Sequence, residues 1–269
     1  AAVWSGALVF LAIWMPYNNG IRFEPDEAVG ALLTWCAVER AIATRRLLPY
    51  AVAAILGAFT LAVAPGGLMA VAALLAGLRP VVRGIVSRRT RDGLLPMLAP
   101  ILAAGTSVLF VIFYAHPLMP LIEGSRVATE VGPTQEWWQE PVRYYYLVLQ
   151  TGDGTFARRF GILVMILCLL VAIFRLMSSH RPPGVAVAPI WRLIAVMLGT
   201  MFFIAFTPTK WTHHFGVYAC IGAALAAATA AMMAPPLLRS RRNRTFFAAA
   251  VLLVTGVAAA GTNMWWYVG

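Results

Sequence analysis

Charge is scarce in this 269-residue chain. Only 12% of the residues are charged, and a single lysine, Lys210, stands among the 21 basic residues. Soluble globular domains carry about 25% charged residues, whereas here apolar residues make up 61% of the chain and the mean hydropathy is +0.79. The composition excludes an ordinary soluble domain and predicts an integral membrane protein.

Cysteine and metal-binding motifs are also sparse. Cys36, Cys168 and Cys220 each lie inside an apolar segment without CxxC-type spacing, and the HExxH pattern is absent, so neither a disulfide framework nor a metal site is indicated. No cofactor is evident from the sequence. No compact carboxylate cluster argues for a divalent cation, although residues outside this chain could complete one.

Long apolar runs are abundant. A transmembrane helix needs roughly 20 apolar residues, and several uninterrupted runs in the chain approach or reach this length. Two other apolar segments, 28–42 and 49–79, are interrupted by charges or by Pro65-Gly66-Gly67. We expect 49–79 to form two short helices that meet at this turn. The fold class predicted is therefore all-α, a polytopic transmembrane helical bundle, with uninterrupted spans near 1–16, 94–115, 160–177, 191–206, 214–236 and 246–263.

The charges divide between the two sides of such a bundle. With alternating spans, one set of loops carries fifteen of the 21 basic residues against two acids, and the opposite loops carry eight of the ten acids. The positive-inside rule makes the arginine-rich side cytoplasmic. The arginine runs at 88–91 and 239–244 then set topology and contact anionic lipid headgroups, and a nucleic-acid partner is not favoured.

Three clusters fall on the outer side of the predicted bundle. They are Arg22 with Glu24, Asp26 and Glu27; Arg158 with Arg159; and the segment from Lys210 through Trp211 to His213 and His214. A carboxylate suits a sugar hydroxyl or a general base, and cationic groups suit the charge that develops on a phosphate leaving group. Together these groups indicate transfer from a lipid phosphate.

Each cluster also has a structural interpretation. Glu24 beside Arg22 could be an exposed ion pair of little energetic value, and Asp26 or Glu27 could cap a helix. The two arginines could extend along apolar surface to water or hold a lipid phosphate. Because adjacent residues point in two directions from a helix, we expect at most one of the two histidines to enter a site.

The run Phe206–Gly216 resembles the arabinosyltransferases of the mycobacterial cell envelope, the Emb family targeted by ethambutol. The likeness extends over essentially the whole chain. It is carried further by Asn19–Pro25, Leu33–Trp35 with Val38–Arg40, Ala99–Ala104, Ala157–Phe160, Ser240–Arg244 and Trp265–Val268.

The resemblance implies a GT-C glycosyltransferase that moves arabinofuranose from decaprenylphosphoryl arabinose to the arabinan of arabinogalactan or lipoarabinomannan, outside the plasma membrane. It implies a homodimer or heterodimer with a paralogue, and an acyl carrier protein on the cytoplasmic face. Glu24 and His213 match residues of the donor and ethambutol pocket. Arg22, Lys210, Trp211, Arg158 and Arg159 are expected donor neighbours by position.

Two departures from the family pattern bear on this expectation. The motif around Glu24 usually reads Arg-Pro-Glu-Pro, but this chain has Phe23 and a more acidic continuation, Asp26-Glu27. The family's catalytic aspartates would lie upstream of residue 1 and its carbohydrate-binding region beyond Gly269. We therefore expect residues 1–269 to be the central transmembrane portion of a larger enzyme, inactive by itself.

Two other functions stay open at this point. A transporter or flippase for a polyprenyl-linked sugar would use a broken helix such as 49–79, and a non-catalytic scaffold subunit would need none of the predicted site. Among the paralogues of this family, the sequence of Arg143–Leu147 weakly favours the C-type, which elongates lipoarabinomannan.

Overall fold

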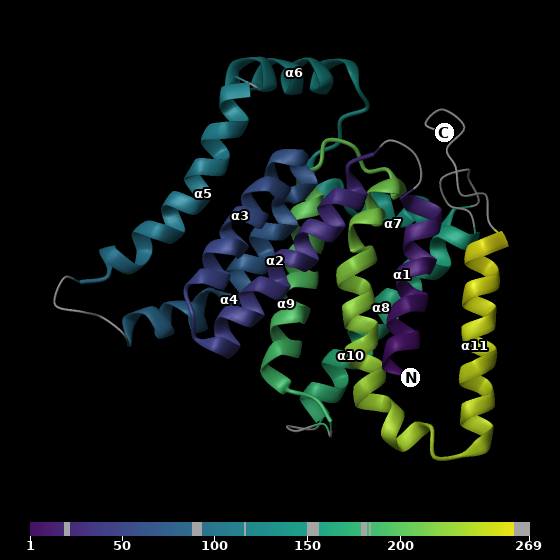
Figure 1. Cartoon of the computed structure of the whole chain (residues 1–269). Helices are drawn as coiled ribbons and strands as arrows, with labels where there is room; N and C mark the ends of the chain where they lie inside the picture. Colours follow the sequence, from purple (N-terminus) through teal and green to yellow (C-terminus); the bar gives the residue numbers. More distant parts are fainter. Residues whose placement is uncertain are drawn as a thin grey trace.

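The fold is a bundle of helices (Figure 1). A computed structural model of the chain describes residues 1–18, 22–87, 93–115, 117–149, 156–178, 182 and 184–260. The predicted all-α class is confirmed. The helices are α1 (Ala2–Tyr17), α2 (Glu24–Thr44), α3 (Leu48–Val63), α4 (Leu68–Val86), α5 (Leu95–Ala115), α6 (Leu118–Val131), α7 (Pro141–Val148), α8 (Phe156–Ser178), α9 (Val187–Phe203), α10 (Ala219–Leu237) and α11 (Arg241–Ala260).

Each predicted span corresponds to a helix. Within the described ranges, five segments are long and apolar enough to cross a membrane, while α1 and α3 are shorter apolar helices. In Figure 1 successive helices run up and down the bundle, and α5 leans away from the rest. The chain is a multi-pass membrane protein, and its five long apolar segments are Leu68–Val86, Leu95–Tyr114, Arg158–Ser178, Val187–Ile204 and Thr212–Ala234.

The long segment 49–79 is divided as predicted. Helices α3 and α4 meet at a single 3-10 turn, Pro65–Gly67, but α4 continues to Val86, beyond the predicted end at residue 79. The turn is tight, because a Cβ atom on Gly67 would lie 2.0 Å from the Thr60 carbonyl oxygen and 2.7 Å from the Leu61 Cα. Only glycine allows α3 and α4 to approach this closely.

The main hydrophobic core lies between α1, α8, α9 and α10. It is built from buried side chains such as Ile13, Met165, Ile194, Met197 and Leu225. Helix α10 consists largely of alanine, so the backbone of α1 can pack closely against it, as small residues allow in membrane proteins. This packing holds the ends of α1, α9 and α10 together where the polar clusters lie.

The long polar stretch 116–159 contains α6, α7 and a single 3-10 turn between them. In Figure 1 α6 lies across one end of the bundle instead of alongside the spanning helices. Its Arg126 pairs with Glu123 at 2.6 Å and with Glu130, and all three side chains are exposed. A helix placed in this way, with exposed charges along one side, suits a membrane surface. His116 and the residues from 150 to 155 lie outside the described residues.

We expect Gly67→Ala to destabilise the protein, because the added methyl meets backbone atoms that cannot rotate away. Overpacking of this kind costs about 1–3 kcal/mol, and Gly256→Ala, whose Cβ meets nothing within 4 Å, is the matched control. Thermal unfolding of both variants in detergent measures the difference. Equal melting temperatures for the two variants would show that the α3–α4 turn is looser than described.

Candidate functional site

The site centres on one carboxylate oxygen, Glu24 Oε1. It lies 3.2 Å from His214 Nδ1, 3.6 Å from Arg22 Nη1 and 3.7 Å from His213 Nε2. Glu24 is only 6% exposed, so the exposed ion pair considered from the sequence is wrong. Its place in the first turn of α2, followed by Pro25, also puts its negative charge at the positive end of a helix dipole.

Both histidine rings lie close to the Glu24 carboxylate. The expectation that at most one of them would enter the site is therefore wrong with respect to contact with Glu24. The reason is local, because residues 212–218 form a 3-10 helix in which the two rings lie 4.1 Å apart at 51°. His214, not His213, lines the adjacent cavity. The other nitrogen of His214, Nε2, is 3.2 Å from Thr209 Oγ1, which fixes the plane of the ring.

A glycine allows the histidine segment to reach α1 and α2. A Cβ atom on Gly216 would lie 2.0 Å from Asn18 Oδ1 and 3.3 Å from Glu24 Cβ. The Asn18 side-chain amide donates to the Gly216 carbonyl oxygen at 3.1 Å. The close packing of three separate segments at this glycine therefore sets the distance between Glu24 and the imidazoles.

A second acid, Glu27, lies one turn further along α2. It is 3% exposed and packs against the Pro65–Gly67 turn, where a Cβ on Gly66 would lie 2.4 Å from its Oε2. Its other oxygen, Oε1, has no hydrogen-bond partner within the described part of the chain. From the sequence, Glu27 was expected either in the outer cluster or as a helix cap, and the structure places it as a second buried carboxyl group on the cavity.

A cavity of about 250 Å³ opens between these groups. Pockets that enclose whole drug-sized ligands measure about 300–1,000 Å³, so this cavity suits a fragment such as one sugar ring or a phosphate. Its wall combines two carboxyl groups, an imidazole and two threonines with apolar side chains. The residues that line it include Glu24, Glu27, Gly66, Ile204, Thr209 and His214.

Arg143 of α7 holds residues 204–211 in place, and this loop forms part of the cavity wall. The side chain is fully buried and its Nε and Nη2 donate to Glu140, at 2.7 and 3.1 Å. It also donates to the Trp211 carbonyl at 2.8 Å and to Thr207 Oγ1 at 2.7 Å, with longer bonds to two more carbonyls of the loop. One guanidinium thus fixes residues 204–211 by charge-assisted hydrogen bonds.

Lys210 is buried within the same loop. Its Nζ donates to the carbonyl oxygens of Ala205, at 2.5 Å, and Thr207, at 2.8 Å, and lies 3.8 Å from Glu140 Oε2. Burial lowers the pKa of Lys210, Glu140 partly opposes this, and Arg143 adds to the lowering. The ammonium group stabilises the loop, and its expected contact with the donor stays a prediction.

The remaining predicted residues surround the cluster at a greater distance. Trp211 stacks on Tyr146 at 6.1 Å between ring centroids. Arg158 is buried, with its guanidinium carbon 5.6 Å from the Tyr17 ring centroid, and Tyr17 in turn contacts Phe215. Arg159 Nη2 donates to the Leu149 carbonyl at 3.0 Å. The structure therefore brings Arg22, Glu24 and His213 together and places the other four predicted residues around them.

The arrangement can hold an anionic, hydroxylated ligand and move a proton. Glu24 can accept hydrogen bonds from hydroxyls, and the path from Glu24 through His214 to Thr209 is continuous. Glu24, His213 and His214 also place one ligand atom each within 4.8 Å of one another, a set that sequence spacing did not anticipate. The Arg22 guanidinium already supplies a positive charge at that carboxylate, which favours an anion over a metal cation.

Comparison with known proteins identifies the relatives of this chain. A probable arabinosyltransferase B of Mycolicibacterium smegmatis is 48% identical over 268 residues, covering 100% of this chain and 25% of the relative. A probable arabinosyltransferase C of the same organism is 46% identical over 225 residues, covering 84% and 21%. The cryo-EM structure of arabinosyltransferase EmbB from Mycobacterium smegmatis superimposes with a TM-score of 0.74 and 41% identity, covering 99% of this chain and 23% of that chain.

The chain is a polytopic membrane protein with the GT-C fold, and it carries a buried acid–imidazole cluster. The family described as "Mycobacterial cell wall arabinan synthesis protein" matches residues 1–269, and the chain belongs to this family. The chain spans about a quarter of the length of these relatives. Both B-type and C-type relatives match, so the leaning towards the C-type stays a prediction.

We expect Arg143→Met to loosen residues 204–211, because it leaves Glu140 and several carbonyls without their donor. Breaking a buried pair costs about 3–5 kcal/mol, so amide exchange in this segment should accelerate by at least about tenfold. Hydrogen exchange of the complete protein measures this. Arg126→Met, which removes an exposed guanidinium that also has two glutamate partners, is the control. Unchanged exchange at 204–211 would refute the role given to Arg143.

Proposed function

We propose that this chain forms the donor-binding membrane portion of an arabinosyltransferase. The reaction would transfer arabinofuranose from decaprenylphosphoryl arabinose to cell-wall arabinan, with the arabinan of arabinogalactan or lipoarabinomannan as acceptor. The proposal is supported by membership of the arabinan synthesis family and by the names of the relatives.

One feature of the site links the proposed donor binding to particular atoms. The Glu24 carboxylate, with Arg22 and the two imidazoles around it, faces a small cavity at one end of the bundle. A sugar attached to a lipid phosphate presents hydroxyls and an anionic group side by side. Glu24 would accept from the pentose hydroxyls, while Arg22 would attract the phosphate.

The surrounding groups have supporting roles in this proposal. His213 and His214 orient the Glu24 carboxylate, and His214 can exchange a proton with it. Arg158 and Arg159 begin the span of α8 close to the same end of the bundle, so they would neighbour the lipid phosphate. The group that activates the acceptor is assigned to a part of the complete protein outside residues 1–269.

The orientation and partners follow from charge and family. The acidic and histidine-bearing end would face the outside of the plasma membrane, because the opposite loops carry most of the arginines. The complete protein would form a homodimer or a heterodimer with a paralogue. An acyl carrier protein, an acidic partner, would dock on the arginine-rich face.

The direct test replaces Glu24 by Gln in the complete protein. Loss of a hydrogen bond to a charged group costs about 1.5–3 kcal/mol, so arabinose transfer from decaprenylphosphoryl arabinose to a short arabinan acceptor should fall about 10-fold to 100-fold. Asp26→Asn removes an exposed carboxylate two residues away and should leave transfer unchanged. His213→Ala in a folded protein should lower transfer as well.

Three results would contradict the proposal. Full transfer by folded Glu24→Gln protein would remove the carboxylate from the donor site. Movement of the intact lipid-linked sugar across vesicles, without transfer in the wild type, would favour a flippase. Absence of both activities in the wild type would favour a scaffold subunit.

A further inference from the structure

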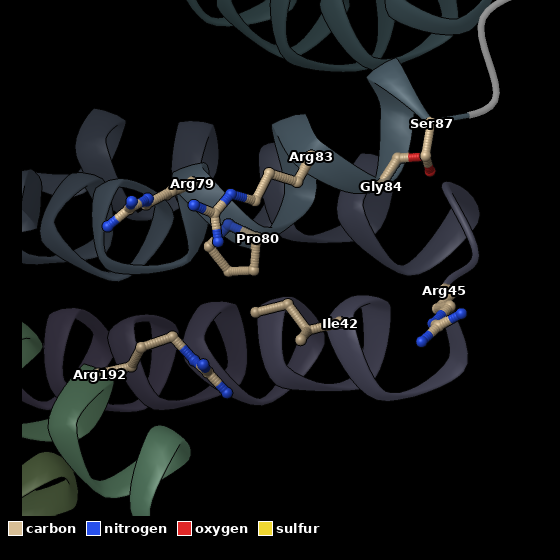
Figure 2. A pocket seen from close by; sticks show the side chains of 8 residues that line it. All are labelled: Ile42, Arg45, Arg79, Pro80, Arg83, Gly84, Ser87 and Arg192. Carbon is tan, nitrogen blue, oxygen red and sulfur yellow. The ribbon is translucent and has the colours of Figure 1, made fainter.

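Four arginines from three helices surround a second cavity, at the end of the bundle opposite Glu24. Arg45 follows the C-terminus of α2, Arg79 and Arg83 lie on α4, and Arg192 lies near the start of α9. The cavity measures about 660 Å³. Figure 2 shows the two α4 arginines on one side of it and Arg45 on the other, with Arg192 alongside.

The backbone places these charges together. Arg79 and Arg83 are four residues apart and therefore share one face of α4, and the ring of Pro80 lines the cavity between them. Arg45 ends α2 with a left-handed backbone, φ 56°, which turns the chain sharply at the rim. Like charges at this spacing repel one another, so the concave surface has a strongly positive potential.

Among the described residues, Arg192 is the one arginine of the four with an acidic partner. Arg192 donates to Glu39 through Nε at 2.5 Å and Nη2 at 2.6 Å. Across the part of the chain that the structure describes, no acidic side chain lines this cavity, and no ion pair involves Arg45, Arg79 or Arg83. Three guanidinium groups are therefore available to an anion that enters.

We propose that this cavity binds the phosphate headgroup of an anionic phospholipid. Guanidinium groups match phosphate oxygens bidentately, and the cavity is large enough for a headgroup. A second feature favours a lipid as the source of the phosphate. Leu78 and Val82, which directly precede Arg79 and Arg83 in sequence, are exposed and line an apolar groove between α3, α4 and α5. Such a groove suits an acyl chain, which a soluble phosphate lacks.

The test uses the complete protein and does not measure sugar transfer, so its outcome is independent of the proposed function. Native mass spectrometry from detergent counts lipids retained after addition of phosphatidylglycerol, with phosphatidylcholine as the neutral comparison. Arg79→Gln with Arg83→Gln should weaken phosphatidylglycerol binding by about fivefold for each charge removed. Arg79→Lys with Arg83→Lys, which keeps the charge, reports on folding and should bind with intermediate strength.

The matched control removes two arginines elsewhere. Arg241→Gln with Arg242→Gln takes the same charge from exposed positions at the start of α11, where a headgroup contact would have no cavity around it, and should weaken phosphatidylglycerol binding much less. The proposal would be overturned if the two glutamine double variants lost phosphatidylglycerol binding equally, or if both retained it. Competition by millimolar inorganic phosphate with no preference for phosphatidylglycerol would identify a soluble phosphate site instead. Loss of acyl carrier protein binding alone, with lipid binding intact, would also overturn it.

Discussion

The burial of one negative charge is the constraint on which the site depends. A carboxylate that leaves water must be paired and hydrogen-bonded, and Glu24 meets this requirement with Arg22 and two imidazoles around a single oxygen. These partners come from the start of α2 and from the 3-10 segment before α10, which are far apart in sequence. The ends of α1, α2 and α10 must therefore lie at fixed distances from one another, and much of the local packing holds them there.

Three structural features fix the distance between Glu24 and its partners. Gly216 lets the histidine segment touch Asn18 and Glu24, the Pro65–Gly67 turn supports Glu27 from behind, and Arg143 ties the loop 204–211 to α7. Two of these features are close contacts that glycine allows, and the third is a set of charge-assisted hydrogen bonds. The site end of the bundle thus owes its geometry to glycine contacts and to Arg143, in addition to the apolar packing that it shares with the core.

Sequence reasoning predicted the fold well, because each spanning helix requires its own apolar run and each break requires a visible proline, glycine or charge. It also predicted Arg22, Glu24 and His213, which belong to short motifs. It missed the roles of Glu27, His214 and Arg143 for one reason: each acts through a residue distant in sequence, at the 65–67 turn, at Glu24 and at the 204–211 loop. Lys210 drew attention as an isolated cation, but the structure gives its ammonium group backbone partners in its own loop. The arginine cavity could not be foreseen as a unit, since hydropathy and charge bias say only that these arginines share one side.

The central claim is that the Glu24 cluster receives the sugar of a lipid-linked donor. The most direct measurement is a cryo-EM structure of the complete protein with a non-hydrolysable phosphonate analogue of decaprenylphosphoryl arabinose. The account predicts a pentose hydroxyl within hydrogen-bonding distance of the Glu24 carboxylate and the phosphonate on the side of Arg22. An analogue bound elsewhere, with no density for it in the cavity beside His214, would contradict this claim.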